Sequence, residues 1–147
     1  MHGCAEDDGH SSPYAALRLA FDVIFPHTSD ILYLDADIVI QEDLTPMYNH
    51  YLAEIKASKY CYAGYTNYLD PGRGELVGGV LLFDLNKAKE NNFFPRARYN
   101  ITHKFYIWYD QSAMQDTELY VELQSKYNYM KKYECRVFEP AILHFTD

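Results

Sequence analysis

The pattern of apolar positions predicts strands that alternate with helices. Unbroken apolar runs rich in β-branched and aromatic residues are typical of buried strands, and they occur at residues 31–40, 60–65, 78–85 and 140–147. Apolar residues spaced by three to four positions, or capping signals, predict helices at residues 12–25, 45–58, 86–92 and 110–124. Residues 67–74 and 126–139 are expected to be irregular, and residues 93–109 give no clear pattern. Without a repeat or a linker, the sequence predicts one α/β domain over residues 1–147.

The first predicted helix carries a basic residue beside its apolar stripe. Ser12 and Pro13 form its expected start, and Pro26 ends it. Its buried face is expected to consist of Tyr14, Leu17, Phe21, Ile24 and Phe25. Arg18 falls beside this face, where an arginine usually lies along the surface with its charged end in water.

Two acidic residues interrupt the first apolar run. Asp35 and Asp37 stand at the end of a predicted buried strand, and side chains two apart in extended backbone point to the same side. Carboxylates are costly to bury unless something pairs with them, and oxygen ligands at one point suit Mg²⁺ or Mn²⁺. Ligands of open α/β sheets bind at the carboxyl ends of strands. An acidic pair also commonly caps the next turn or helix, and this alternative stays open.

Composition and charge narrow the class of partner. A length of 147 residues, 48% hydrophobic and 23% charged, suffices for one ordinary globular core. The net charge of −8 and the lack of a lysine or arginine cluster argue against nucleic acid as a partner. No apolar run reaches the length of a membrane span, so we expect no such segment in this chain.

The cysteines and one short motif leave the compartment open. Cys4, Cys61 and Cys135 lack the spacing of a zinc site, and an odd count permits one disulfide with a free thiol, or none. Asn100-Ile101-Thr102 is an N-glycosylation sequon, which has meaning only in a secretory lumen.

Five motifs stand in an order that resembles one enzyme family. They are Arg18-Leu19 on a helix, LYLDADIVIQEDL at 32–44, GGVLLFDL at 78–85, Asp110-Gln111, and PAILHFT at 140–146. In this order the chain is similar to the retaining glycosyltransferases of family 8. The resemblance implies a GT-A-type mixed sheet flanked by helices, a UDP-sugar donor, and a carbohydrate or glycoconjugate acceptor. It also implies that the chain is the central and later part of such a domain, without either end.

The resemblance further implies a metal site. Asp35, Asp37 and His144 would ligate Mn²⁺, or Mg²⁺, and neutral imidazole is a reasonable ligand for Mn²⁺. A lone histidine on an apolar strand is otherwise more often a hydrogen-bonded core residue.

The donor site is implied in the same way. The matching substrate-binding positions are Arg18, Asp35, Gly78, Gly79, Asp110 and Gln111, with Asp110 and Gln111 as the catalytic pair beside the anomeric carbon. Gln111 is an amide and cannot act as a general base, so it would orient or stabilise through hydrogen bonds. This suits a retaining reaction in which the charge of the leaving diphosphate is absorbed by the metal.

Departures from the family pattern keep a non-catalytic alternative open. Val77 stands where the family usually has an asparagine that reaches the donor sugar, and the lysine segment that normally follows the histidine motif is not in this sequence. In this alternative, the chain is a transferase-like domain that binds a sugar or a partner without turnover. A second alternative is an Asp-x-Asp phosphatase with Asp35 as nucleophile, although Ile38 and Val39 follow where that class usually has a Gly-Thr pair.

Overall fold

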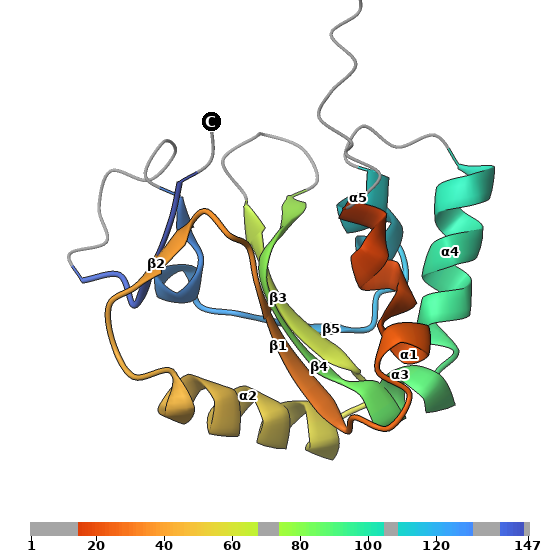
Figure 1. Cartoon of the computed structure of the whole chain (residues 1–147), viewed down its shortest axis with the longest axis horizontal. Coiled ribbons are helices and arrows are strands. Elements are labelled where there is room, and N and C mark those ends of the chain that lie inside the picture. Colours follow the sequence, from red (N-terminus) through yellow and green to blue (C-terminus); the bar gives the residue numbers. More distant parts are fainter. Residues whose placement is uncertain (1–14, 68–73, 105–108, 131–138, 146–147) are drawn as a thin grey trace, which may run out of the picture.

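The computed structural model describes residues 15–67, 74–104, 109–130 and 139–145, and its centre is a mixed four-stranded sheet (Figure 1). The strand order is β1 (Asp30–Leu34), β4 (Glu75–Asp84), β3 (Tyr62–Asn67) and β5 (Tyr120–Glu122). β1 and β3 run antiparallel to β4, whereas β5 runs parallel to β3. The prediction of an α/β fold with a mixed sheet is confirmed.

A second, smaller sheet brings the end of the described chain back to the first motif. It consists of β2 (Ile38–Ile40), β7 (Ile142–His144) and β6 (Tyr129–Met130), with β2 antiparallel and β6 parallel to β7. In this register Ile38 faces His144. The pairing therefore places the histidine motif beside the two aspartates.

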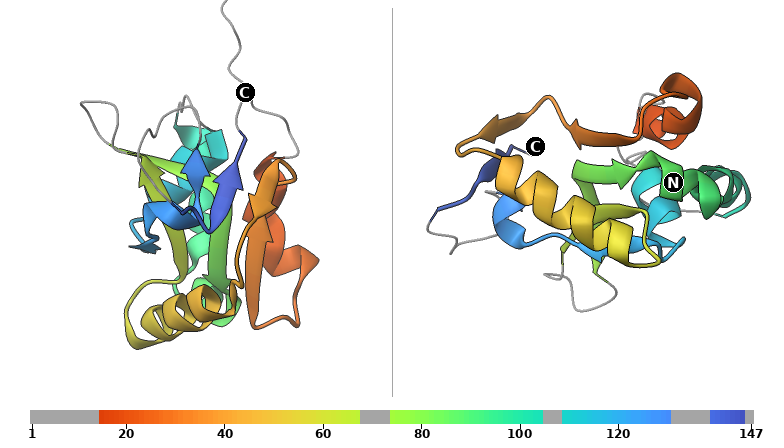
Figure 2. Two further views of the ribbon diagram at one scale, coloured as in Figure 1. Left: turned by 90° about the vertical axis from the view of Figure 1, so that its left-hand side faces the viewer. Right: turned by 90° about the horizontal axis from the view of Figure 1, so that it is seen from below.

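Helices cover both faces of the main sheet (Figures 1 and 2). One face carries η1 (Ala15–Ala20), α1 (Phe21–Ile24), α3 (Leu85–Glu90), α4 (Phe93–His103) and α5 (Tyr109–Gln115). The other carries α2 (Thr45–Ala57), and a short helical turn η2 (Ser125–Tyr127) precedes β6. In the described part of the chain, no helix combines the length and apolarity needed to cross a bilayer.

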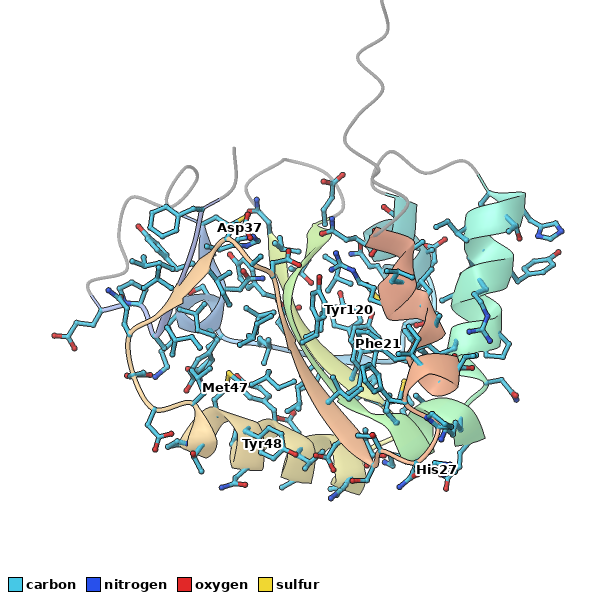
Figure 3. All side chains as sticks on the ribbon, viewed as in Figure 1. Phe21, His27, Asp37, Met47, Tyr48 and Tyr120 are labelled. Carbon is cyan, nitrogen blue, oxygen red and sulfur yellow. The ribbon has the colours of Figure 1, made fainter. Side chains whose placement is uncertain are left out.

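The core forms because side chains of β4 alternate between the two faces. Leu81 and Phe83 join the cluster under α3 and α4, whereas Val80 and Leu82 join the cluster above α2. All four are fully buried. Met47 on α2 points toward the sheet, and Phe21 and Tyr120 lie on its other side (Figure 3).

The first apolar run differs from the expected buried strand. β1 ends at Leu34, residues 36 and 37 form a turn, and β2 belongs to the other sheet. The two carboxylates therefore converge across a turn and not along extended backbone. Every residue of β1 is only half-buried, because among the described strands β1 has one neighbour, β4.

The expected buried face of the first helix is confirmed at Phe21 and wrong at Leu17, Ile24 and Phe25. Arg18, Leu19 and Phe21 are buried, whereas Leu17, Ile24 and Phe25 are 52%, 46% and 42% exposed. Residues 15–20 form a 3₁₀ helix, whose three residues per turn shift the inward face away from the α-helical spacing. Ser12, Pro13 and Tyr14 lie outside the described residues.

Three further segments also depart from the sequence-based expectation. The helix expected over 110–124 ends at Gln115, since Glu118 adopts a left-handed φ of 57° and Tyr120–Glu122 pair with β3. Residues 93–103, which gave no pattern, form α4. Residues 126–130, expected to be irregular, belong to η2 and β6 apart from residue 128.

The sequon and one cysteine lie in the interior. Asn100 is 9% exposed, and its Nδ2 donates to the carbonyl of Ala113 at 3.3 Å. A glycan on this nitrogen is incompatible with the folded chain.

Cys61 is a buried free thiol, and burial raises its pKa to about 12. Cys4 and Cys135 lie outside the described residues.

Candidate functional site

Asp35, Asp37 and His144 meet where β1 turns into β2. Figure 3 labels Asp37 at this turn. The β2–β7 pairing continues beyond the strands, because the N–H of Phe145 donates to the carbonyl of Asp37 at 2.9 Å. His144 Nε2 lies 3.5 Å from Asp37 Oδ1 and 3.8 Å from Asp35 Oδ2. One ligand atom from each residue falls within 4.8 Å of the others.

This donor set fits a hard divalent cation. Two ligands held about 2.1 Å from one ion are separated by at most about 4.2 Å, and both distances from Nε2 satisfy this limit. The three ligand atoms together span up to 4.8 Å, so a carboxylate would have to turn slightly inward to complete the site. Two carboxylates and one imidazole suit Mn²⁺ or Mg²⁺ better than a soft metal. His144 is 4% exposed, whereas the Asp37 side chain is 50% exposed, so the cluster is buried on one side and open on the other.

Arg18 lies buried beside this cluster and does not take the surface position that is usual for an arginine. It is 7% exposed, and its Nη1 donates to the carbonyl of Gly78 at 2.6 Å. Its Nε lies 2.8 Å from Asp110 Oδ2, and its Nη2 lies 3.9 Å from Asp35 Oδ1. The guanidinium carbon stands 4.8 Å from the ring centre of Tyr33. Arg18 thus links the Asp35, Asp37 and His144 cluster to the start of α5.

Asp110 occupies the first turn of α5 and is 3% exposed. Burial raises the pKa of this carboxyl, while the Arg18 guanidinium and the backbone N–H groups of Asp110 and Gln111 oppose the rise. The helix start supplies these N–H groups because the first turn has no partners of its own for them. The ion pair with Arg18 compensates in part for the loss of water around the carboxylate.

Gln111 is held by its oxygen. Its Oε1 accepts the N–H of Gly78 at 2.7 Å, and a Cβ added at Gly78 would lie 2.2 Å from Arg18 Nη1 and 3.1 Å from Gln111 Cγ. The side chains of Arg18 and Gln111 therefore both pack directly against the backbone of Gly78. An amide fixed through its oxygen presents its NH₂ group as a donor.

Gly79 packs against the ring of His144, as Gly78 packs against Arg18 and Gln111. A Cβ added there would lie 2.3 Å from Cε1 of His144, which is closer than any real contact. The missing side chain of Gly79 is thus what lets the imidazole lie against β4. The structure brings together every site residue that the sequence predicted, although contact with a substrate stays a prediction.

Two residues of the site were missed by the sequence reasoning. Tyr33 donates its hydroxyl to Asp35 Oδ1, and burial together with this hydrogen bond raises the pKa of Tyr33 to about 12. Its position two residues before Asp35 in a strand is a signal that predicts a shared side. Asn128 contacts His144, and nothing in its sequence context points to that role.

Comparison with known proteins decides the family. A family model described as glycosyl transferase family 8 matches residues 7–146. The chain belongs to glycosyl transferase family 8. A curated relative, the probable galacturonosyltransferase-like 5 of Arabidopsis thaliana, is 30% identical over 100 residues, which cover 56% of this chain and 27% of that protein. The chain thus spans about a quarter of the length of the curated relatives that it matches.

Solved structures of glycosyltransferases share the fold. Galactosyltransferase LgtC, solved with donor and acceptor sugar analogs, superposes with a TM-score of 0.70 at 17% identity, over 94% of this chain and 60% of LgtC. Mouse xyloside xylosyltransferase 1 gives a TM-score of 0.69 at 12% identity, over 93% of this chain and 66% of the other. The GT-A-type fold is confirmed, and membership of this family of transferases removes the phosphatase alternative.

Proposed function

We propose that this family 8 chain binds a UDP-sugar together with Mn²⁺, or Mg²⁺, and transfers the sugar to a carbohydrate or glycoconjugate acceptor with retention of configuration. One observation carries the proposal: the Asp35, Asp37 and His144 cluster adjoins the buried Arg18–Asp110 pair. The two parts touch through Asp35, whose Oδ1 lies 3.9 Å from Arg18 Nη2. A donor with its diphosphate at the cluster would present its sugar to Arg18, Asp110 and Gln111.

Asp35, Asp37 and His144 would hold the metal. When bound, the ion supplies positive charge that offsets the negative charge on the departing diphosphate. The protein's own net charge of −8, with two aspartates at this point, would otherwise repel such an anion.

Arg18 and Asp110 would orient the donor sugar. A buried ion pair gives little net stability, because loss of hydration offsets the attraction, so stability alone is a weak explanation for it. The guanidinium is fixed by Gly78, Asp110 and the Tyr33 ring, which keeps its direction constant. Gln111 would donate a hydrogen bond from its NH₂ group to the sugar. Departure of the leaving group requires no general base from Arg18, Asp110 or Gln111.

Binding without turnover is the second candidate. Val77, in place of the usual asparagine, is half-buried and packs against the core cluster above α2, so it brings no polar group to the donor. This observation favours a domain that recognises the nucleotide sugar and leaves it intact.

Calorimetric titration of UDP with Mn²⁺, repeated with EDTA, tests the binding claim that both candidates share. We expect metal-dependent heat from the wild type and none from Asp35→Asn or Asp37→Asn. Glu42→Gln is the matched control, since it removes an exposed carboxylate that follows β2 and is not part of the cluster. Binding retained in both aspartate variants would refute the metal assignment. Release of UDP from UDP-sugars then separates the enzyme from the binding domain.

A further inference from the structure

Asn128 lies fully buried between the central sheet and the histidine strand. It is 0% exposed and precedes β6, outside every motif that marked the family. Its Nδ2 lies 3.1 Å from the carbonyl oxygen of Val77, and its Oδ1 lies 2.9 Å from Nδ1 of His144. The side chain thus bridges β4 and β7 through two hydrogen bonds.

The chemistry of these partners fixes the position of each hydrogen. The Val77 carbonyl can only accept, so the group facing it must be the NH₂ of Asn128. The amide oxygen is then the atom that faces His144, and it also can only accept. Nδ1 of the imidazole must therefore carry a hydrogen. In the neutral ring, this leaves Nε2 with a lone pair.

This lone pair is directed at the metal cluster. Nε2 lies 3.5 Å from Asp37 Oδ1 and 3.8 Å from Asp35 Oδ2, so three acceptor atoms converge there. The opposite tautomer would donate from Nε2 to one of these carboxylates and would occupy the position that a cation needs. It would also set the Nδ1 lone pair against Asn128 Oδ1 at 2.9 Å, which is repulsive.

We propose that Asn128 is a positioning residue that holds His144 in the tautomer with hydrogen on Nδ1, so that Nε2 is available to the metal. The tautomer follows from the buried hydrogen bonds alone, whereas the consequence for the metal rests on the proposed function. The β2–β7 pairing fixes the backbone of His144, and Gly79 leaves room for its ring. The bond to Asn128 selects the ring's orientation. Partners of this kind behind metal ligands typically change metal affinity 10–100-fold when removed.

The first test reads the tautomer without any metal. Long-range ¹H–¹⁵N correlation spectra of the metal-free chain at alkaline pH distinguish the two neutral forms of each histidine, and His144→Gln assigns the relevant signal. We expect hydrogen on Nδ1 in the wild type. Asn128→Leu removes the amide oxygen that faces the ring, so hydrogen should shift to Nε2, toward the aspartates.

A matched control separates positioning from stability. Asn100 is another buried asparagine that donates to a backbone carbonyl, that of Ala113, and it has no contact with the histidine. Asn100→Leu should lower thermal stability while leaving the His144 signal unchanged. A wild type with hydrogen on Nε2, or an Asn128→Leu variant with the wild-type tautomer, would overturn the proposal.

The second test measures Mn²⁺ affinity on the same folded variants, by electron paramagnetic resonance of free Mn²⁺. We expect Asn128→Leu to bind about 10–100-fold more weakly than the wild type, and Asn100→Leu to stay close to it. Equal affinities in wild type and Asn128→Leu would overturn the role of Asn128 toward the metal. Absence of Mn²⁺ binding from the wild type would instead overturn the proposed function, and the tautomer spectra would still decide what Asn128 does.

Discussion

Replacement of Gly79 by alanine should strongly weaken Mn²⁺ binding at the proposed site through steric displacement of His144 alone. None of the described glycines has a positive φ, so alanine fits the backbone of β4 at this position. The new methyl group would meet Cε1, Nδ1 and Nε2 of the imidazole at 2.3, 2.6 and 2.9 Å. No other residue is among its nearest contacts.

The magnitude follows from these distances. Carbon atoms in contact stand about 3.5 Å apart, so the ring must retreat by about 1.2 Å. Metal–ligand distances tolerate about 0.2 Å, and the bond from Nδ1 to Asn128 would be lost as well. We therefore expect Mn²⁺ affinity to fall by at least about 100-fold, the upper end of the loss seen when only an outer partner is removed. Overpacking should cost about 1–3 kcal/mol, or roughly 2–12 °C in Tm.

The assay combines calorimetric Mn²⁺ titration with thermal unfolding. Gly64→Ala is the matched control, because its methyl group would meet Leu76 Cδ1 at 2.7 Å and Leu81 Cδ2 at 3.1 Å, in the core and away from the cluster. It should lower Tm to a similar extent and leave Mn²⁺ affinity unchanged. A folded Gly79→Ala variant with wild-type Mn²⁺ affinity would refute the reasoning, since the ring could then move without consequence.

Two further predictions concern the donor side. Gln111→Glu keeps the oxygen that accepts from Gly78 but loses the NH₂ donor. Turnover of UDP-sugar should therefore fall about 10²–10³-fold, while UDP affinity measured by calorimetry changes little. Equal losses in turnover and affinity would contradict this role. Arg18→Met removes the cation that opposes the raised pKa of Asp110, so the free energy of unfolding should drop by about 3–5 kcal/mol at neutral pH. An acid whose pKa is raised on folding destabilises the folded state at high pH. The free energy of unfolding of this variant should therefore recover as pH falls toward 3.8, the ordinary pKa of an aspartic acid side chain. Thermal unfolding at several pH values measures this recovery. A double variant with Asp110→Leu should show no such pH dependence, and the same pH response in both variants would contradict the assignment.

Residues that form the site could be predicted because the fold carries them on short local motifs. Asp35 and Asp37 follow one apolar strand, and Asp110 and Gln111 open a helix, so local patterns locate them. His144 was found through the order of motifs, since β7 reaches β2 only by a pairing across about a hundred residues of sequence.

The remaining features depend on contacts that no local pattern records. Asn128 reaches His144 from a segment that reads as irregular, and burial of Arg18 follows from a 3₁₀ helix where the apolar spacing predicted an α-helix. The half-burial of β1 depends on which strands lie beside it, a property of the whole sheet.

The position of β1 also has a consequence for how the chain behaves in solution. Leu85 N–H donates to Ser29 O and Asp35 N–H to Gly79 O, so alternate residues from 29 to 35 bond to β4. The N–H and C=O groups of Asp30, Leu32 and Leu34 therefore point away from the sheet, along a side where Figure 2 shows no further described strand. Such a row of backbone groups is a template for strand addition. Leu17, Val23, Ile24 and Phe25 are also exposed, so we expect concentrated samples to self-associate, and binding heats are best measured at dilutions where the chain is monomeric.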